Sequence, residues 1–72
     1  MTAEEHQLLA VRLGVAADSM AARYGLTCME IAYARPGTDA HALAHRKASR
    51  QYRALMRLTA ALTNLALTGV TL

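Results

Sequence analysis

Hydrophobic and polar positions separate most clearly between Asp39 and about Leu67, where their spacing predicts one long amphipathic helix. At 100° per residue, four arginines fall on a stripe roughly 60° wide. This arginine face consists of Arg46, Arg50, Arg53 and Arg57. The opposite side follows heptad steps and consists of Ala48, Tyr52, Leu55, Thr59, Leu62 and Ala66. The helix is therefore expected to start basic and to end apolar.

The N-terminal half contains local signals for helix starts and stops. Thr2 and Glu5 have the spacing of a capping box, Ser/Thr-x-x-Glu, which opens a helix. Gly14 would stop or bend that helix, because glycine commonly follows a helix end. Asp18 would cap a short second helix, which Gly25 would end. These signals predict two short helices in succession.

A third short helix is predicted directly afterwards. Thr27 and Glu30 repeat the capping-box spacing and would open it. The Pro-Gly pair at 36–37 then breaks the chain, and Thr38 or Asp39 caps the long helix. No stretch alternates with the period of a β-strand. We therefore expect an all-α protein.

The 72 residues are expected to form a single helical domain, with a three-helix unit over 1–35 and the long helix over 38–68. A chain this short buries only about 60% of its unfolded surface. It has no Trp or Phe, so its core would consist mainly of Leu, Met and Ala. We expect a second copy to complete that core as a homodimer. The predicted dimer interface is Tyr52, Leu55, Leu58, Leu62 and Leu65.

Charge is distributed unevenly along the chain. Residues 1–39 hold five acidic and three basic residues, whereas residues 40–72 hold five basic residues and no acid. A basic stripe of this kind suits a polyanion or an acidic protein surface. Two simpler interpretations stay open, because the arginine face could be only solvated or could be neutralised by the chain's own acidic half.

Residues 20–34 resemble a helix-turn-helix motif. That motif has a small residue in its first helix, glycine in its turn and an aliphatic residue in its second helix, and Ala21, Gly25 and Ile31 occupy these places. The small residue lets two helices cross closely, and glycine adopts the left-handed backbone of a three-residue turn. Supporting apolar positions are filled by Met20, Tyr24, Leu26 and Ala34.

This resemblance implies a small DNA-binding transcriptional regulator. Residues 27–35 would lie in the major groove of double-stranded DNA, with Thr27 and Met29 near the bases. Arg23, Arg35 and the arginine face would contact phosphates, which position a protein without reading sequence.

A protein partner is the second hypothesis for function. The predicted recognition helix offers few of the Arg, Lys, Asn and Gln side chains that read base edges. Exposed Met29, Tyr33 and Arg35 would instead suit a protein interface. The chain would then be a small inhibitor or adaptor, of the kind phages encode, that docks on an acidic host protein. Either partner would contact Arg23, Thr27, Met29, Tyr33, Arg35 and the arginine face.

The three histidines and the single cysteine are the candidates for metal binding or redox chemistry. His41 and His45 have the spacing of two metal ligands on one helix face, and His6 and Cys28 could in principle add to them. No C-x-x-C pair anchors such a site, so we expect no metal and partly exposed, neutral imidazoles. Cys28 could be a reactive thiolate at a helix start, but a small buried residue is the expected role.

No constellation of catalytic residues is evident, so we expect neither enzymatic activity nor a cofactor. The chain has one cysteine and therefore no internal disulfide. Its N-terminus is acidic and unlike a signal peptide, and the uncharged tail after Arg57 is shorter than the roughly 20 residues of a membrane span. The expected location is the cytoplasm.

Overall fold

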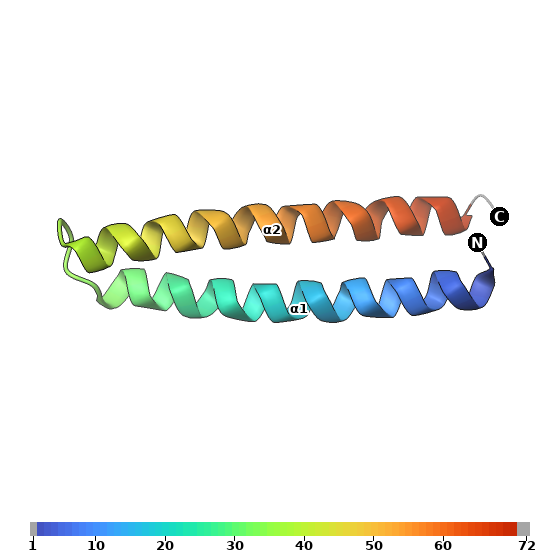
Figure 1. Ribbon diagram of the computed structural model, residues 1–72, viewed down its shortest axis with the longest axis horizontal. Helices are drawn as coiled ribbons and strands as arrows, with labels where there is room; N and C mark the ends of the chain where they lie inside the picture. The colour runs from blue at the N-terminus through green and yellow to red at the C-terminus, as the bar shows by residue number, and fades with distance from the viewer. Residues whose placement is uncertain (1, 71–72) are drawn as a thin grey trace.

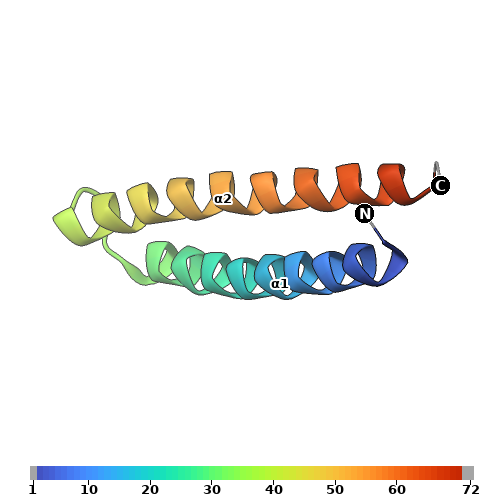
Figure 2. The ribbon, with the colours of Figure 1, turned by 45° about the vertical axis from the view of Figure 1, so that its right-hand side comes forward.

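The computed structural model describes residues 2–70, and the side chains of residues 2–68, as one long helical hairpin. It contains α1 (Ala3–Tyr33) and α2 (Asp39–Val70), which run antiparallel (Figure 1). Both views show the helices side by side along most of their length (Figure 2). The hairpin measures 52 × 15 × 12 Å. The described residues are thus all-α as predicted, but the predicted three short helices are wrong.

One continuous helix replaces the three because a single apolar seam runs through all of residues 6–34. Its members recur at steps of four and three, and each is buried or half-buried. This α1 seam consists of His6, Ala10, Leu13, Ala17, Met20, Tyr24, Thr27, Ile31 and Ala34. The seam passes Gly14 and Gly25 without losing its register. Burial along it outweighs the cost of a mid-helix glycine, which is about 1 kcal/mol.

The predicted internal caps are also wrong. Asp18 is an exposed residue in the middle of α1. Thr27 is 1% exposed, and its hydroxyl donates to the carbonyl of Arg23 at 3.0 Å, the back-bond of a mid-helix threonine. Glu30 lies 3.5 Å from the Lys47 ammonium on α2 instead of capping a helix. Residues 20–34 therefore form no helix-turn-helix.

The long second helix is confirmed, and it presents a matching seam to α1. This α2 seam consists of His41, Ala44, Ala48, Gln51, Leu55, Leu58, Leu62 and Leu65. It differs in part from the predicted apolar side, since Tyr52, Thr59 and Ala66 are exposed. Ala44 and Ala48 are among the most buried residues and lie toward the turn. Such small side chains let the two helices approach closely.

The N-terminal ends of both helices are capped as the sequence indicates. The Thr2 side chain accepts a hydrogen bond from the backbone N–H of Glu5 at 3.1 Å. In the turn, Gly37 has a φ of +85°, in the left-handed region that favours glycine. The Thr38 hydroxyl donates to the carbonyl of Arg35 at 2.7 Å and accepts from the N–H of His41 at 3.3 Å. The predicted break at 36–37 and the cap at Thr38 are therefore confirmed.

A side-chain hydrogen bond also links the two helices at the open end of the hairpin. Nε2 of His6 donates to the backbone carbonyl of Leu65 at 2.8 Å. The two residues are 59 positions apart, so this bond joins the start of α1 to the last turns of α2. It fixes the imidazole tautomer, because the carbonyl can only accept.

Replacing Gly14 and Gly25 with alanine is expected to stabilise the hairpin. Neither glycine has a positive φ, and a Cβ at either position would meet nothing within 4 Å. Each substitution should add about 0.5–1 kcal/mol to the free energy of unfolding, measured by urea denaturation followed by circular dichroism. Gly37→Ala is the control and should destabilise, because its φ is left-handed. A helix-turn-helix would require Gly25→Ala to destabilise, so the sign of the change separates the two folds.

Candidate functional site

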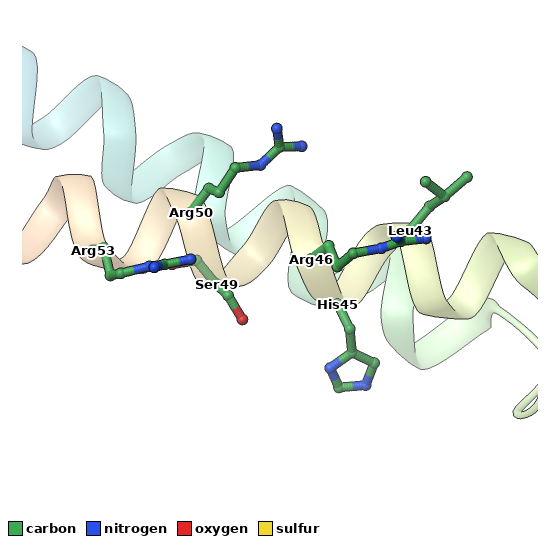
Figure 3. Close-up of a pocket in the computed structure, with 6 residues that line it drawn as sticks. All are labelled: Leu43, His45, Arg46, Ser49, Arg50 and Arg53. Atoms are coloured by element: carbon green, nitrogen blue, oxygen red, sulfur yellow. The ribbon is translucent and has the colours of Figure 1, made fainter.

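The arginine face lies on the side of α2 turned away from α1. Its four arginines are exposed, and the α2 seam occupies the opposite side of the helix. Together with neighbouring side chains from α2, three of them line a shallow groove (Figure 3). The groove residues are Leu43, His45, Arg46, Ser49, Arg50 and Arg53. The predicted cluster of basic residues is thus presented by one continuous helix.

The carboxylates that the structure describes do not form ion pairs with this face. Within residues 2–68, the ion pair that forms across the hairpin joins Lys47 to Glu30, and no carboxylate pairs with any arginine of the face. Arg53 is positioned instead by a hydrogen bond from its Nε to the carbonyl of Ser49 at 3.3 Å. The guanidinium groups therefore keep most of their donors for an external partner.

Other residues predicted to bind a partner are separated from this face. Thr27 is buried between the helices, where no ligand reaches it. Met29 and Tyr33 are exposed on α1, while Arg23 lies on the same helix and Arg35 lies in the turn. The structure therefore divides the predicted residues between two surfaces.

The predicted dimer-interface residues mostly contribute to the contact within the chain. Leu55, Leu58, Leu62 and Leu65 belong to the α2 seam, and Leu65 is only 8% exposed. Tyr52 is half-exposed beside this seam, and its ring centroid is 5.8 Å from that of Tyr24 on α1. The homodimer stays a prediction, but any second copy must use surface that α1 does not already cover.

A second groove follows one edge of the contact between the helices. Cys28, predicted to be buried, is exposed beside this groove, because it lies one position outside the α1 seam. A hydrogen bond with Cys28 raises the pKa of Tyr24 above its ordinary value, and the negative charge of the thiolate adds to this effect. The groove is lined by Tyr24, Cys28, Ile31, His45, Ala48, Ser49, Tyr52 and Arg53.

The two histidines at the start of α2 contact one another. The ring centroids of His41 and His45 are 4.6 Å apart, with the rings edge to face. Among the described residues, no group of three His, Cys, Asp or Glu side chains is placed to hold a metal ion. The two rings therefore form an aromatic contact at the start of α2.

Sequence reasoning missed a second apolar surface, on the side of α1 facing away from α2. We call it the outer stripe: Leu8, Val11, Val15, Ala22, Leu26, Met29 and Tyr33. At 100° per residue these seven positions fall within roughly 60°, so the helical period alone could have revealed them. The predicted breaks at Gly14 and Gly25 concealed this stripe by dividing it among three helices.

No protein-family model, curated protein or solved structure matches the chain. Neither α1 nor α2, over the residues described, has a run of apolar residues long and hydrophobic enough to cross a bilayer. The arginine face and the outer stripe are the two exposed surfaces of the hairpin that suit a partner.

Proposed function

We propose that the protein is a non-enzymatic inhibitor or adaptor that docks the arginine face of α2 on an acidic surface of another protein. The observation that carries this proposal is the row of exposed arginines without carboxylate partners among residues 2–68. From Arg46 to Arg57 the row spans about 16 Å along the helix. Guanidinium groups pair with carboxylates in bidentate fashion, which gives such a contact both attraction and geometry.

Apolar side chains beside the arginines favour a protein partner over a nucleic acid. Leu43 is 59% exposed and lines the same groove as Arg46 and Arg50, and Met56 is exposed next to Arg57. Arginine and methionine are enriched at protein interfaces, where an apolar centre is surrounded by polar groups. A phosphate backbone would gain little from the exposed leucine. The helix-turn-helix that favoured DNA is also absent from residues 20–34.

The same proposal places the protein in the cytoplasm of the cell that contains its partner. Its one cysteine has no second cysteine in the chain with which to form a disulfide. Cys28 is also exposed, and an exposed free thiol is most compatible with a reducing compartment.

Affinity capture with matched charge variants tests the proposal. Tagged protein is incubated with bacterial lysate, with and without nuclease, and retained proteins are identified. We expect a protein that survives nuclease treatment and whose retention falls at least about tenfold with Arg50→Glu/Arg53→Glu, because both favourable charges are reversed. Arg23→Glu/Arg35→Glu makes the same charge change away from the arginine face and should keep most of the binding. Loss with this control and not with the first variant would contradict the proposal.

Nucleic acid is the alternative ligand, favoured by the five basic residues between 46 and 57. If it binds there, nuclease will release all retained material. Affinity for a double-stranded DNA fragment will then fall steeply with salt, and Arg50→Ala/Arg53→Ala will lower that slope by about two. That combination of results would replace the protein partner with DNA or RNA.

A further inference from the structure

The outer stripe gives α1 a second apolar side, opposite its contact with α2. At 100° per residue the centres of the α1 seam and the outer stripe are separated by roughly 170°. From Leu8 to Tyr33 the stripe extends over about 38 Å of helix. A helix that is apolar on two opposite sides is normally covered on both of them. In the hairpin α2 covers only one.

The outer stripe is fully open in the single chain. Its six large members are between 51% and 85% exposed. Asp18 and Ser19 interrupt it near its middle, and the apolar positions resume at Ala22. Exposed apolar surface of this extent on a monomer marks an interaction site, even with one polar break.

The size of the exposed surface indicates how much a partner must cover. The chain exposes 5494 Å². A compact protein of 7.8 kDa exposes about 4,400 Å², so the excess is about 1,100 Å². The radius of gyration is 16.2 Å, against about 11 Å for a compact domain of this length. A stable dimer interface buries about 800 Å² per partner, which the excess can supply.

We propose that a second copy of the chain covers the outer stripe, with the two α1 helices packed antiparallel about a two-fold axis near residues 20–21. This register places Leu8 of one copy level with Tyr33 of the other, and Val15 level with Leu26. Small residues, Ala22 among them, meet at the axis, where the helices approach most closely. The large apolar positions of one copy are thereby offered large apolar partners of the other.

Charge at the edge of the stripe favours the antiparallel orientation. Arg12 and Glu30 lie on the same flank of the stripe, at similar distances from the proposed axis. Antiparallel packing about the two-fold axis keeps this flank of both copies on the same edge of the interface. It brings Arg12 of each copy level with Glu30 of the other, whose carboxylate also pairs with Lys47 of its own chain. Parallel packing would place the two flanks on opposite edges of the interface, where Arg12 of one copy does not meet Glu30 of the other. The antiparallel arrangement therefore gains pairs of opposite charges that the parallel one lacks.

Mass measurement in solution tests the interface. Sedimentation of the purified chain at micromolar concentrations should give twice the 7.8 kDa of one copy. Val15→Glu/Leu26→Glu should give the single-chain mass with unchanged helix content, because both side chains are exposed in the hairpin. Ala42→Glu/Ala60→Glu adds the same charge at exposed positions of α2 and should stay dimeric. A wild-type chain that sediments as a monomer at every concentration would overturn the proposal, as would a dimeric Val15→Glu/Leu26→Glu variant.

Disulfide formation tests the orientation without disrupting the stripe. In a Cys28→Ser background, chains carrying Val15→Cys are mixed with chains carrying Leu26→Cys and mildly oxidised. The antiparallel dimer yields a disulfide between the two kinds of chain and at least about tenfold less between identical chains. Preferential linkage of identical chains would overturn the orientation, and linkage no greater than for an Ala42→Cys and Ala60→Cys mixture would overturn the interface.

Discussion

Ala44→Glu is expected to lower the free energy of unfolding by about 3 kcal/mol or more, which should leave most chains unfolded. Ala44 is 5% exposed on the α2 seam, near the turn where small residues bring the helices together. The new carboxylate would lose water there and would meet no cation among the residues of the two seams. A chain of this size has a small margin of stability, rarely above about 3–5 kcal/mol.

The matched control is Ala42→Glu, the same exchange at an exposed position two residues earlier. Urea denaturation followed by circular dichroism compares the two variants with the wild type. We expect Ala42→Glu to change the free energy of unfolding by no more than about 0.5 kcal/mol, as for most surface substitutions. Equal midpoints for the two variants would show that Ala44 does not face α1.

Leu65→Ala is expected to cost about 2–5 kcal/mol, the range for deleting a buried leucine side chain. Leu65 is the largest of the buried hydrophobic side chains among the described residues. Its side chain lies on the α2 seam that packs against α1, so truncation to alanine would leave a cavity between the helices. Loss of packing there should also weaken the hydrogen bond that His6 makes to the Leu65 carbonyl.

Leu67→Ala serves as the control, because it deletes the same atoms two residues later, where leucine is 63% exposed. Thermal unfolding of both variants and the wild type gives the comparison. A larger loss of stability from Leu67→Ala would show that the face of α2 turned away from α1 carries the main packing contact. That result would contradict the seam described above.

The second helix could be predicted from sequence because several signals agree there. The Pro-Gly pair at 36–37 and the cap at Thr38 mark its start, and the arginines repeat with the period of a helix. The arginine face followed from that period alone. Which residues of the opposite side meet α1 could not be predicted in full, since Tyr52, Thr59 and Ala66 are exposed.

The first helix differs from the prediction because its continuous seam outweighs the local signals for helix starts and stops. Gly14 and Gly25 each lower the stability of a helix by about 1 kcal/mol relative to alanine. Ending the helix at each glycine would avoid that loss. A seam shared with α2 over residues 6–34 recovers more than that, but only when the helix continues through both glycines. The Thr27–Glu30 spacing does not identify a helix start by itself. A threonine hydroxyl can also donate to a backbone carbonyl one turn earlier in the same helix, as Thr27 does.

Because the hairpin has a single turn, the sequence separation between contacting residues increases steadily from the turn to the open end. Glu30 and Lys47 are close in sequence, whereas His6 and Leu65 stand 59 residues apart. Closing the short loop costs the least conformational entropy, so folding begins beside the turn and zips toward the open end. The hairpin therefore opens first at its open end and last beside the turn. Backbone amide hydrogens near residues 6 and 65 will exchange with solvent before those beside Ala44.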